Sequence, residues 1–351
     1  MILTTINELR LAFPTHALDD VAPLMGFIEN SEHEILYDKL GRHLYEELVE
    51  YYNTIDKTSE DYINADSRSM FPMAKLLRLC QRAVAFDAMS RAIGVQAVSL
   101  SNMGVNTATA DDYGTPTKEM IDLFKNTCSR ETRICVNLIL EYLEDLCHDT
   151  ETLKMRGTDP STGTDAQKEA AEICAEWKES RYYFLSSDVL IPSATILQQY
   201  LNIYDNREKF ISMLPDLRYI QDEQIAPLIG EDFCSDLCHI AVGGTDNRLL
   251  ATIISRLRRC LAAYLEERTS VITISKERKL AAHTEGERHI KAAVEYCKIH
   301  QEELEKMDVI STSIPLAPWY EKADDTDACD CQQGFRNNQP GNVMFVLPGM
   351  D

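Results

Sequence analysis

Cys234, Cys238 and His239 are residues whose types could bind a metal ion. Their spacing on a helix places the two thiols on one face and directs the imidazole elsewhere. A structural zinc ion takes four ligands, usually from two pairs of Cys or His residues, and no second pair follows at a suitable spacing. We therefore expect no metal ion and no cofactor at this position.

Cys329 and Cys331 form a second candidate, because they lie beside the acidic tract at 324–327. Thiols in an exposed segment can bind a soft metal or take part in redox chemistry, although chance exposure is the simpler interpretation. A role for this pair therefore stays open. His283 and His289 lie six residues apart, on different faces of a helix, and belong to no His-Glu-x-x-His pattern.

Signatures of enzymes are missing from the sequence: it has no nucleophile elbow, phosphate-binding loop or dinucleotide fingerprint. Acid-base catalysis needs two carboxylates in different environments, whereas five clustered glutamates have the pattern of a uniformly solvated acidic surface. These glutamates are Glu32, Glu34, Glu46, Glu47 and Glu50. We therefore expect a protein without enzymatic activity.

The composition is that of a folded protein with an unusual charge. Of the 351 residues, 44% are hydrophobic and 26% are charged, and the length suggests about two domains. The net charge is −22, which excludes a protein that holds DNA by its overall field but suits a channel wall that DNA passes without adhering. The N-terminus lacks a signal peptide and no run is apolar enough to span a membrane, so we expect a reducing cytoplasm.

Most of the eleven cysteines stand alone in helix-like segments. A free Cys in such a position is usually a small buried apolar residue. We expect burial for Cys80, Cys128, Cys135, Cys147, Cys174, Cys260 and Cys297.

The apolar periodicity predicts a mainly α-helical protein. In the N-terminal half, helices are expected at 19–39 and 44–52 and around Leu76, followed by a short β-ribbon near 105–108 and by a helix that Thr117 caps. The inner face of that last helix is predicted to consist of Met120, Leu123, Phe124, Ile134, Leu138, Tyr142 and Leu146.

In the C-terminal half, Ser193 is predicted to cap a helix at 194–202. Further helices are expected at 205–228, 232–240, 246–268 and 276–307. A basic patch on one of them is expected to form ion pairs, within the chain or with the acidic surface of a neighbouring subunit. This patch consists of Arg256, Arg258 and Arg259.

Two segments of the chain repeat each other at a constant offset of 189 residues, and Gly41 in the first matches Gly230 in the second. A duplicated helical unit without a polar signature is more typical of a protein that presents surfaces to partners than of an enzyme. We therefore predict two homologous units, with Gly41 and Gly230 at equivalent breaks. The other positions that match at this offset are Glu34, Leu36, Leu44 and Leu48 with Glu223, Ile225, Phe233 and Leu237. A second match, at a different spacing, follows on the next helix of each half, where Arg78-Leu79 and Ala85-Phe86 align with Arg256-Leu257 and Ala263-Tyr264.

The clearest linker is the Gly-, Pro- and Ser-rich stretch at 155–165. It divides the chain, and from Ile314 onward the helical periodicity ends. The predicted organisation is a first helical unit at 1–154, a linker with a short helix at 155–185, a second helical unit at 186–308 and an extended C-terminal arm at 309–351.

The arm contains an apolar run with the composition of a strand, flanked by Gly341 and Pro348. The arm has too few apolar residues for a core of its own, and ordering it costs about 1–2 kcal/mol per residue in backbone entropy. We expect the run to be ordered by another subunit or another protein, although packing against its own domain is an alternative. The run consists of Val343, Met344, Phe345, Val346 and Leu347.

Short motifs also carry a resemblance to a known family. They are Leu214-Pro215, Tyr219-Ile220, the run from Gln224 to Gly230, the helix around Arg256–Tyr264 and the run from Leu36 to Tyr45. Together they resemble an uncharacterised helical family of Bacteroides phages and prophages, over most of residues 1–308. The helix end that places a proline before two apolar residues and a glycine is also similar to that of the small head-tail connector, or adaptor, proteins of tailed phages.

The resemblance implies a function in virion assembly. Connector proteins form rings beneath the portal, through which DNA passes, and their C-terminal arm commonly reaches onto the portal or a neighbour. The implied partners are further copies of the chain in a homo-oligomeric ring, the portal protein and tail or neighbouring connector proteins, without specific DNA binding and without a membrane. The protein would be made in the host bacterial cytoplasm and reside at the head-tail junction of the virion. The alternative is a cytoplasmic helical interaction or regulatory protein without a virion role.

Overall fold

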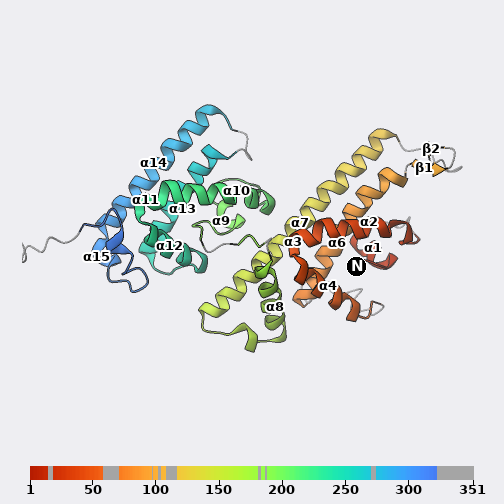
Figure 1. Cartoon of the computed structure of the whole chain (residues 1–351), viewed down its shortest axis with the longest axis horizontal. Coiled ribbons are helices and arrows are strands. Elements are labelled where there is room, and N and C mark those ends of the chain that lie inside the picture. Colours follow the sequence, from red (N-terminus) through yellow and green to blue (C-terminus); the bar gives the residue numbers. More distant parts are fainter. Residues whose placement is uncertain are drawn as a thin grey trace, which may run out of the picture.

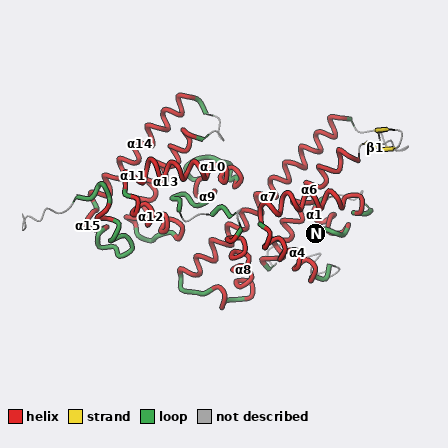
Figure 2. The backbone as a smooth tube through the Cα atoms, viewed as in Figure 1, coloured by secondary structure: helices red, strands yellow, loops and turns green. Residues whose placement is uncertain are grey.

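The computed structural model shows a mainly α-helical chain (Figure 1). Helices account for most of the path in Figure 2, and a two-stranded ribbon is the exception among the described residues. None of the helices described is both long and apolar enough to cross a membrane. The structure describes residues 1–14, 19–57, 71–96, 98–101, 104–107, 117–180, 183–185, 188–269 and 274–321.

Residues 1–180 form what we call the first helical group. Its elements are α1 (Ile6–Ala12), η1 (Ala22–Leu24), α2 (Met25–Ser31), the π-helical turn η2 (Glu32–Leu36), α3 (Tyr37–Leu40), α4 (Arg42–Thr54), α6 (Pro72–Gln96), β1 (Val98–Ser101), β2 (Gly104–Thr107), α7 (Lys118–Met155), η3 (Pro160–Thr162) and α8 (Asp165–Glu179).

Residues 188–321 form the second helical group. Its elements are α9 (Ala194–Gln198), α10 (Arg207–Ile220), the π-helical turn η4 (Gln221–Ile225), α11 (Ala226–Ile229), α12 (Glu231–Gly243), α13 (Arg248–Arg268), α14 (Lys276–Ile299), α15 (Gln301–Leu304) and η5 (Ile314–Leu316).

Local sequence explains where the main helices begin. The hydroxyl of Thr117 accepts a hydrogen bond from the backbone N–H of Met120 at the start of α7, and Ser193 does the same for Ile196 at the start of α9. Both predicted caps are therefore confirmed, and each satisfies a backbone donor that the first helical turn leaves free. The ribbon expected between the two long helices is also present, with Val98 opposite Thr107 in an antiparallel register.

A pair of long helices dominates each group. The contacts between α6 and α7 and those between α13 and α14 are the most extensive in the molecule. The two pairs incline in the same direction, and the ribbon lies at the outer end of the α6/α7 pair (Figure 1). The cysteines expected to be apolar core residues are buried, and they pack mainly within these helices. That prediction is confirmed.

The inner face predicted for α7 is partly wrong. Met120, Leu123 and Ile134 are exposed, whereas Cys135, Ile139 and the residues one turn further on are buried. The first turns of α7, which carry Met120 and Leu123, extend toward the ribbon at the outer end of the helix pair, so these two side chains have little to pack against (Figure 1). The buried face of α7 includes small cysteines, whereas the prediction considered only large apolar residues.

The predicted domain boundaries need two corrections. The short helix expected between the two units is present as α8, but it packs on α4, α6 and α7 and buries Trp177, so it belongs to the first helical group. The arm was expected to start at 309, but Ile310, Ile314 and Trp319 are buried in the core of the second helical group. Their apolar side chains return to the helices, so any extended arm starts no earlier than 322, beyond the described residues.

The order of elements in the two groups coincides over one stretch. The π-helical turns η2 and η4, the one-turn helices α3 and α11, and the helices α4 and α12 begin and end at positions that differ by 189 throughout. A π-helical turn is rare and usually occurs as a single turn within an α-helix. Its presence at the same place in both groups is therefore a specific structural match, which the apolar pattern did not predict.

Candidate assembly interface

Gly41 and Gly230 lie at breaks of the same local form. Each follows a one-turn helix and precedes a helix of 13 residues. Their φ angles of +81° and +99° lie in the region that favours glycine. A Cβ on Gly41 would collide with the side chain of Ser180, and one on Gly230 would lie 3.0 Å from the Cα of Ala317. Backbone conformation and space thus both favour glycine at these breaks.

The two tryptophans of the chain cap the helices that end at these glycines. The indole Nε1 of Trp177 donates a hydrogen bond of 3.1 Å to the carbonyl of Lys39, at the end of α3. The indole Nε1 of Trp319 donates one of 2.9 Å to the carbonyl of Ile229, at the end of α11. Both indoles are buried, and each comes from the segment that follows the long helix pair of its group. The end of each group therefore closes over its own glycine break.

The first π-helical turn anchors the N-terminal segment. Glu32 accepts hydrogen bonds from the backbone N–H of Ile2 and from the hydroxyl of Tyr45, both 2.8 Å long, and Gln81 donates one of 2.7 Å to the carbonyl of Ile2. Burial raises the pKa of Glu32, although these two hydrogen bonds act to lower it. The expectation that Glu32 belongs to a solvated surface is wrong, because this part of the turn faces the core.

The second π-helical turn anchors a matching segment. Gln221 accepts a hydrogen bond of 2.9 Å from the backbone N–H of Leu190, and Arg258 donates one of 2.7 Å to the carbonyl of Leu190. Arg256 likewise donates to a carbonyl, that of Ala292, over 2.6 Å. These two arginines of the predicted basic patch thus bind backbone carbonyls in the hydrogen bonds observed, not the carboxylates expected.

Arg207 joins the two helical groups. Its guanidinium is buried at the start of α10. There Nε donates a hydrogen bond of 3.0 Å to the carboxylate of Glu144 on α7, and Nη2 donates one of 3.0 Å to the hydroxyl of Thr195. Nη1 lies 2.9 Å from a carboxylate oxygen of Asp205. Its backbone N–H donates a hydrogen bond of 2.9 Å to the side-chain oxygen of Asn137 on α7. Burial acts to lower the pKa of Arg207, but Glu144 and Asp205 outweigh it and raise the pKa. The charge of the arginine is therefore well compensated at this joint.

Lys39 adds a second ion pair between the groups. Its Nζ lies 3.2 Å from a carboxylate oxygen of Glu208 on α10, and it lies the same distance from Asp38 beside it. Burial lowers the pKa of Lys39, but the two carboxylates raise it by more. Because α12 also contacts α7, the joint between the groups involves the start of α10 and also α12.

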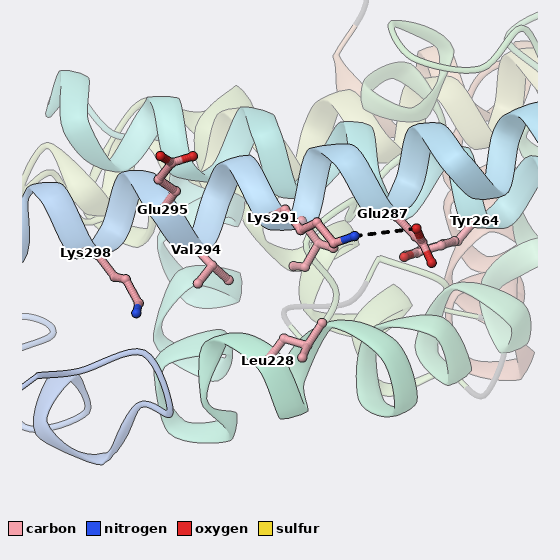
Figure 3. A pocket seen from close by; sticks show the side chains of 8 residues that line it. Leu228, Tyr264, Glu287, Lys291, Val294, Glu295 and Lys298 are labelled. Atoms are coloured by element: carbon pink, nitrogen blue, oxygen red, sulfur yellow. Dashed lines mark ion pairs between the residues drawn. The ribbon is translucent and has the colours of Figure 1, made fainter.

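The second helical group carries a groove of about 460 Å³ between α11 and α14. Leu228 of α11 faces Val294 and Lys291 of α14 across it (Figure 3). Lys291 pairs with Glu287 at 3.7 Å, and Lys298 at one end of the groove pairs with Glu321 at 3.0 Å. The groove therefore has an apolar floor and charged rims, which suits a protein surface more than a polar small molecule.

The residues first considered for chemistry are dispersed. Cys234 and Cys238 are both buried in α12. The thiol of Cys238 donates a hydrogen bond of 3.6 Å to the side-chain oxygen of Gln221. A hydrogen bond with the neighbouring thiol of Cys234 raises the pKa of Cys238, and burial raises it further. His283 lies 2.9 Å from Glu267 on the surface. Among the described residues, no three His, Cys, Asp or Glu side chains gather in a way that holds a metal ion.

Two sequence predictions fall outside the part of the chain that the structure describes. They are the candidate pair Cys329 and Cys331 and the apolar run Val343–Leu347.

Sequence reasoning missed Trp177, Trp319 and Arg207. A signal for the tryptophans was present, because the chain has only two and each follows a long helix pair at the end of its group. No such signal marks Arg207, since its burial depends on how the two groups meet.

The comparisons with known proteins give one match. Residues 36–149, from the end of η2 to near the end of α7, match the model of a family of unknown function, DUF6712. No curated protein and no solved structure matches the chain. The chain is thus similar over part of its first helical group to DUF6712.

Proposed function

We propose that the chain is a structural protein of a phage virion, which forms a ring at the head-tail junction below the portal. The observation that carries the proposal is the pair of like helical groups joined in series, with the same sequence of π-helical turn, one-turn helix, glycine and 13-residue helix in each. We infer from it that the chain contains two homologous units. A unit that already binds its own duplicate side by side has the property that a repeating assembly requires.

The charge of the protein supports the same function. A net charge of −22 gives the chain a field that repels DNA phosphates. Tight binding would impede a DNA molecule that has to pass through a ring, because affinity rises with each phosphate that a protein neutralises. An acidic ring lets the DNA pass without adhering.

Analysis of purified virions tests the proposal. An antibody against the chain, with gold-labelled detection in the electron microscope, is expected to mark the single vertex where the tail joins the head. Detection of the protein in infected cells but not in purified particles would contradict the virion role and favour a cytoplasmic interaction or regulatory protein. The tail fibres and the capsid surface, which lie far from that vertex, provide the internal control for labelling.

A further inference from the structure

The two helical groups have cavities at matching positions. In the second group this is the groove between α11 and α14. In the first group a cavity of about 330 Å³ lies between the η2–α3 segment and α7. The lining residues on α7 are Ser129, Thr132, Arg133 and Val136, and those on α14 include Glu287, Ile290, Lys291 and Val294. Each α14 position follows its α7 counterpart by 158 residues. On the opposite wall, Leu228 follows Lys39 by the 189 residues of the repeat.

The second helical group covers this place in the first. Glu208 at the start of α10 lines the cavity and pairs with Lys39. Arg207 beside it binds Glu144, two helical turns further along α7 than Val136. The face formed by α3 and α7 is therefore the surface on which the start of α10 docks.

The matching face of the second group is exposed in the described part of the chain. Leu228 is 49% exposed and Ile299 is 70% exposed, although both are apolar. By the same offset of 158, Ile299 corresponds to Glu141 and Glu302 corresponds to Glu144. Both of these α7 glutamates form ion pairs with Arg207, Glu141 at 3.9 Å and Glu144 at 3.0 Å. The positions that bind the second group in α7 therefore have exposed counterparts in α14 and just after it.

We propose that the α11/α14 face binds the first helical group of a second copy of this chain, in the way that the α3/α7 face binds the second helical group within one chain. Such a contact is head-to-tail, so every copy keeps one face free for the next. The copies then join in series through the same kind of joint that exists inside each chain. The contact itself does not depend on the proposed function; only the expectation that the joined copies close into a ring rests on it.

The docking residues of the second copy follow from the same correspondence. Asp19 matches Glu208 by the offset of 189, and it is fully exposed. Asn7 on α1 matches Thr195 on α9 when the capping residues Thr5 and Ser193 are aligned, and Leu11, one turn beyond Asn7, is 49% exposed. Asp19 would meet the lysines of the groove, and Leu11 would meet its apolar side chains.

Two full-length double variants test the head-to-tail contact. The first, Leu228→Glu with Ile299→Glu, places carboxylates on the α11/α14 face. The second, Leu11→Lys with Asp19→Lys, removes the apolar and acidic groups of the opposite face. All four side chains are exposed, so the fold is expected to tolerate the changes, which circular dichroism checks.

Size-exclusion chromatography with light scattering gives the readout. We expect the native chain to form large assemblies, each double variant to remain a monomer, and an equimolar mixture of the two to form dimers and nothing larger, because one intact pair of faces remains. Leu280→Glu, at an equally exposed apolar position at the other end of α14, is the control and should assemble as the native chain does. Leu228→Lys should also assemble, because it recreates the Lys39–Glu208 pair with Asp19.

Three results would overturn the contact: a native chain that is monomeric at all concentrations, a first double variant that assembles normally, or a mixture that stays monomeric. The virion test remains independent of these. A labelled vertex together with a normally assembling double variant refutes this contact and leaves the virion role standing, whereas dimers in the mixture without virion label refute only the virion role.

Discussion

The indole N–H of Trp319 donates a 2.9 Å hydrogen bond to the carbonyl of Ile229, ninety residues earlier in the chain. Trp177 makes the same kind of bond to Lys39 in the first helical group. In both groups the segment after the long helix pair thus returns to cap the helix before the glycine break. The final segment of each group contributes to its stability through one polar contact and a large buried ring.

Trp177→Phe and Trp319→Phe keep an aromatic ring but remove the indole donor. Each is expected to lower the free energy of unfolding by about 1–3 kcal/mol, because a buried carbonyl loses its partner. The two losses should add in the double variant, since the sites lie in different helical groups. Urea unfolding followed by circular dichroism measures all three. If only one variant has a lower free energy of unfolding, the two hydrogen bonds do not contribute equally to stability.

Gly41→Ala and Gly230→Ala are expected to destabilise the protein by at least about 1–2 kcal/mol each, the cost of a left-handed backbone for a residue with a Cβ. Crowding by Ser180 and by Ala317 adds to this cost. Gly26→Ala provides the control, because Gly26 lies within α2 with open space around it and should gain up to about 1 kcal/mol. Thermal melting decides between these outcomes; equal effects at all three positions would contradict the account of the breaks.

Arg207→Leu is expected to cost about 3–5 kcal/mol, because it leaves the buried carboxylate of Glu144 without its cation. Adding Glu144→Leu should recover much of the loss, since the pair is then replaced by apolar groups. Chemical unfolding of the single and double variants measures both values. Should the single variant lose less than about 1 kcal/mol, the joint between the groups would depend on other contacts.

Glu32→Gln tests the buried carboxylate against pH. Burial raises the pKa of Glu32, so the folded state favours the protonated form, and the stability tied to that proton is present at low pH and lost as the pH rises through the raised pKa. The glutamine stays neutral, as Gln221 is in the second group. We therefore expect the variant to melt higher than the native chain at neutral pH and at the same temperature near pH 4. A variant that melts lower at neutral pH would show that the Glu32 charge is stabilising.

The apolar pattern predicted the helices well, because their buried faces recur every three to four residues. The matching glycines of the repeat predicted breaks at Gly41 and Gly230, where the structure has a positive φ that favours glycine. The pattern did not predict the π-helical turns, which depend on one inserted residue and not on composition. Nor did it place the core face of α7, because Cys135 is small and Leu123 lies on a part of the helix that has little to pack on.

The candidate interface was less accessible to sequence reasoning than the fold. The burial of Arg207 and the exposure of Leu228 follow from how two groups of like structure meet, and sequence spacing within one group carries no information about that meeting. The repeat itself indicated that matching surfaces exist. Only the structure shows that the α3/α7 face is covered by Arg207 and Glu208 and that the α11/α14 face leaves Leu228 exposed.

Native mass spectrometry of the purified full-length chain over a range of concentrations shows whether the copies join head to tail. We expect a series of head-to-tail oligomers that ends at one dominant closed ring, whose mass is a fixed integer multiple of the chain mass. A chain that remains monomeric at every concentration, or that stops at a dimer and grows no further, would contradict it.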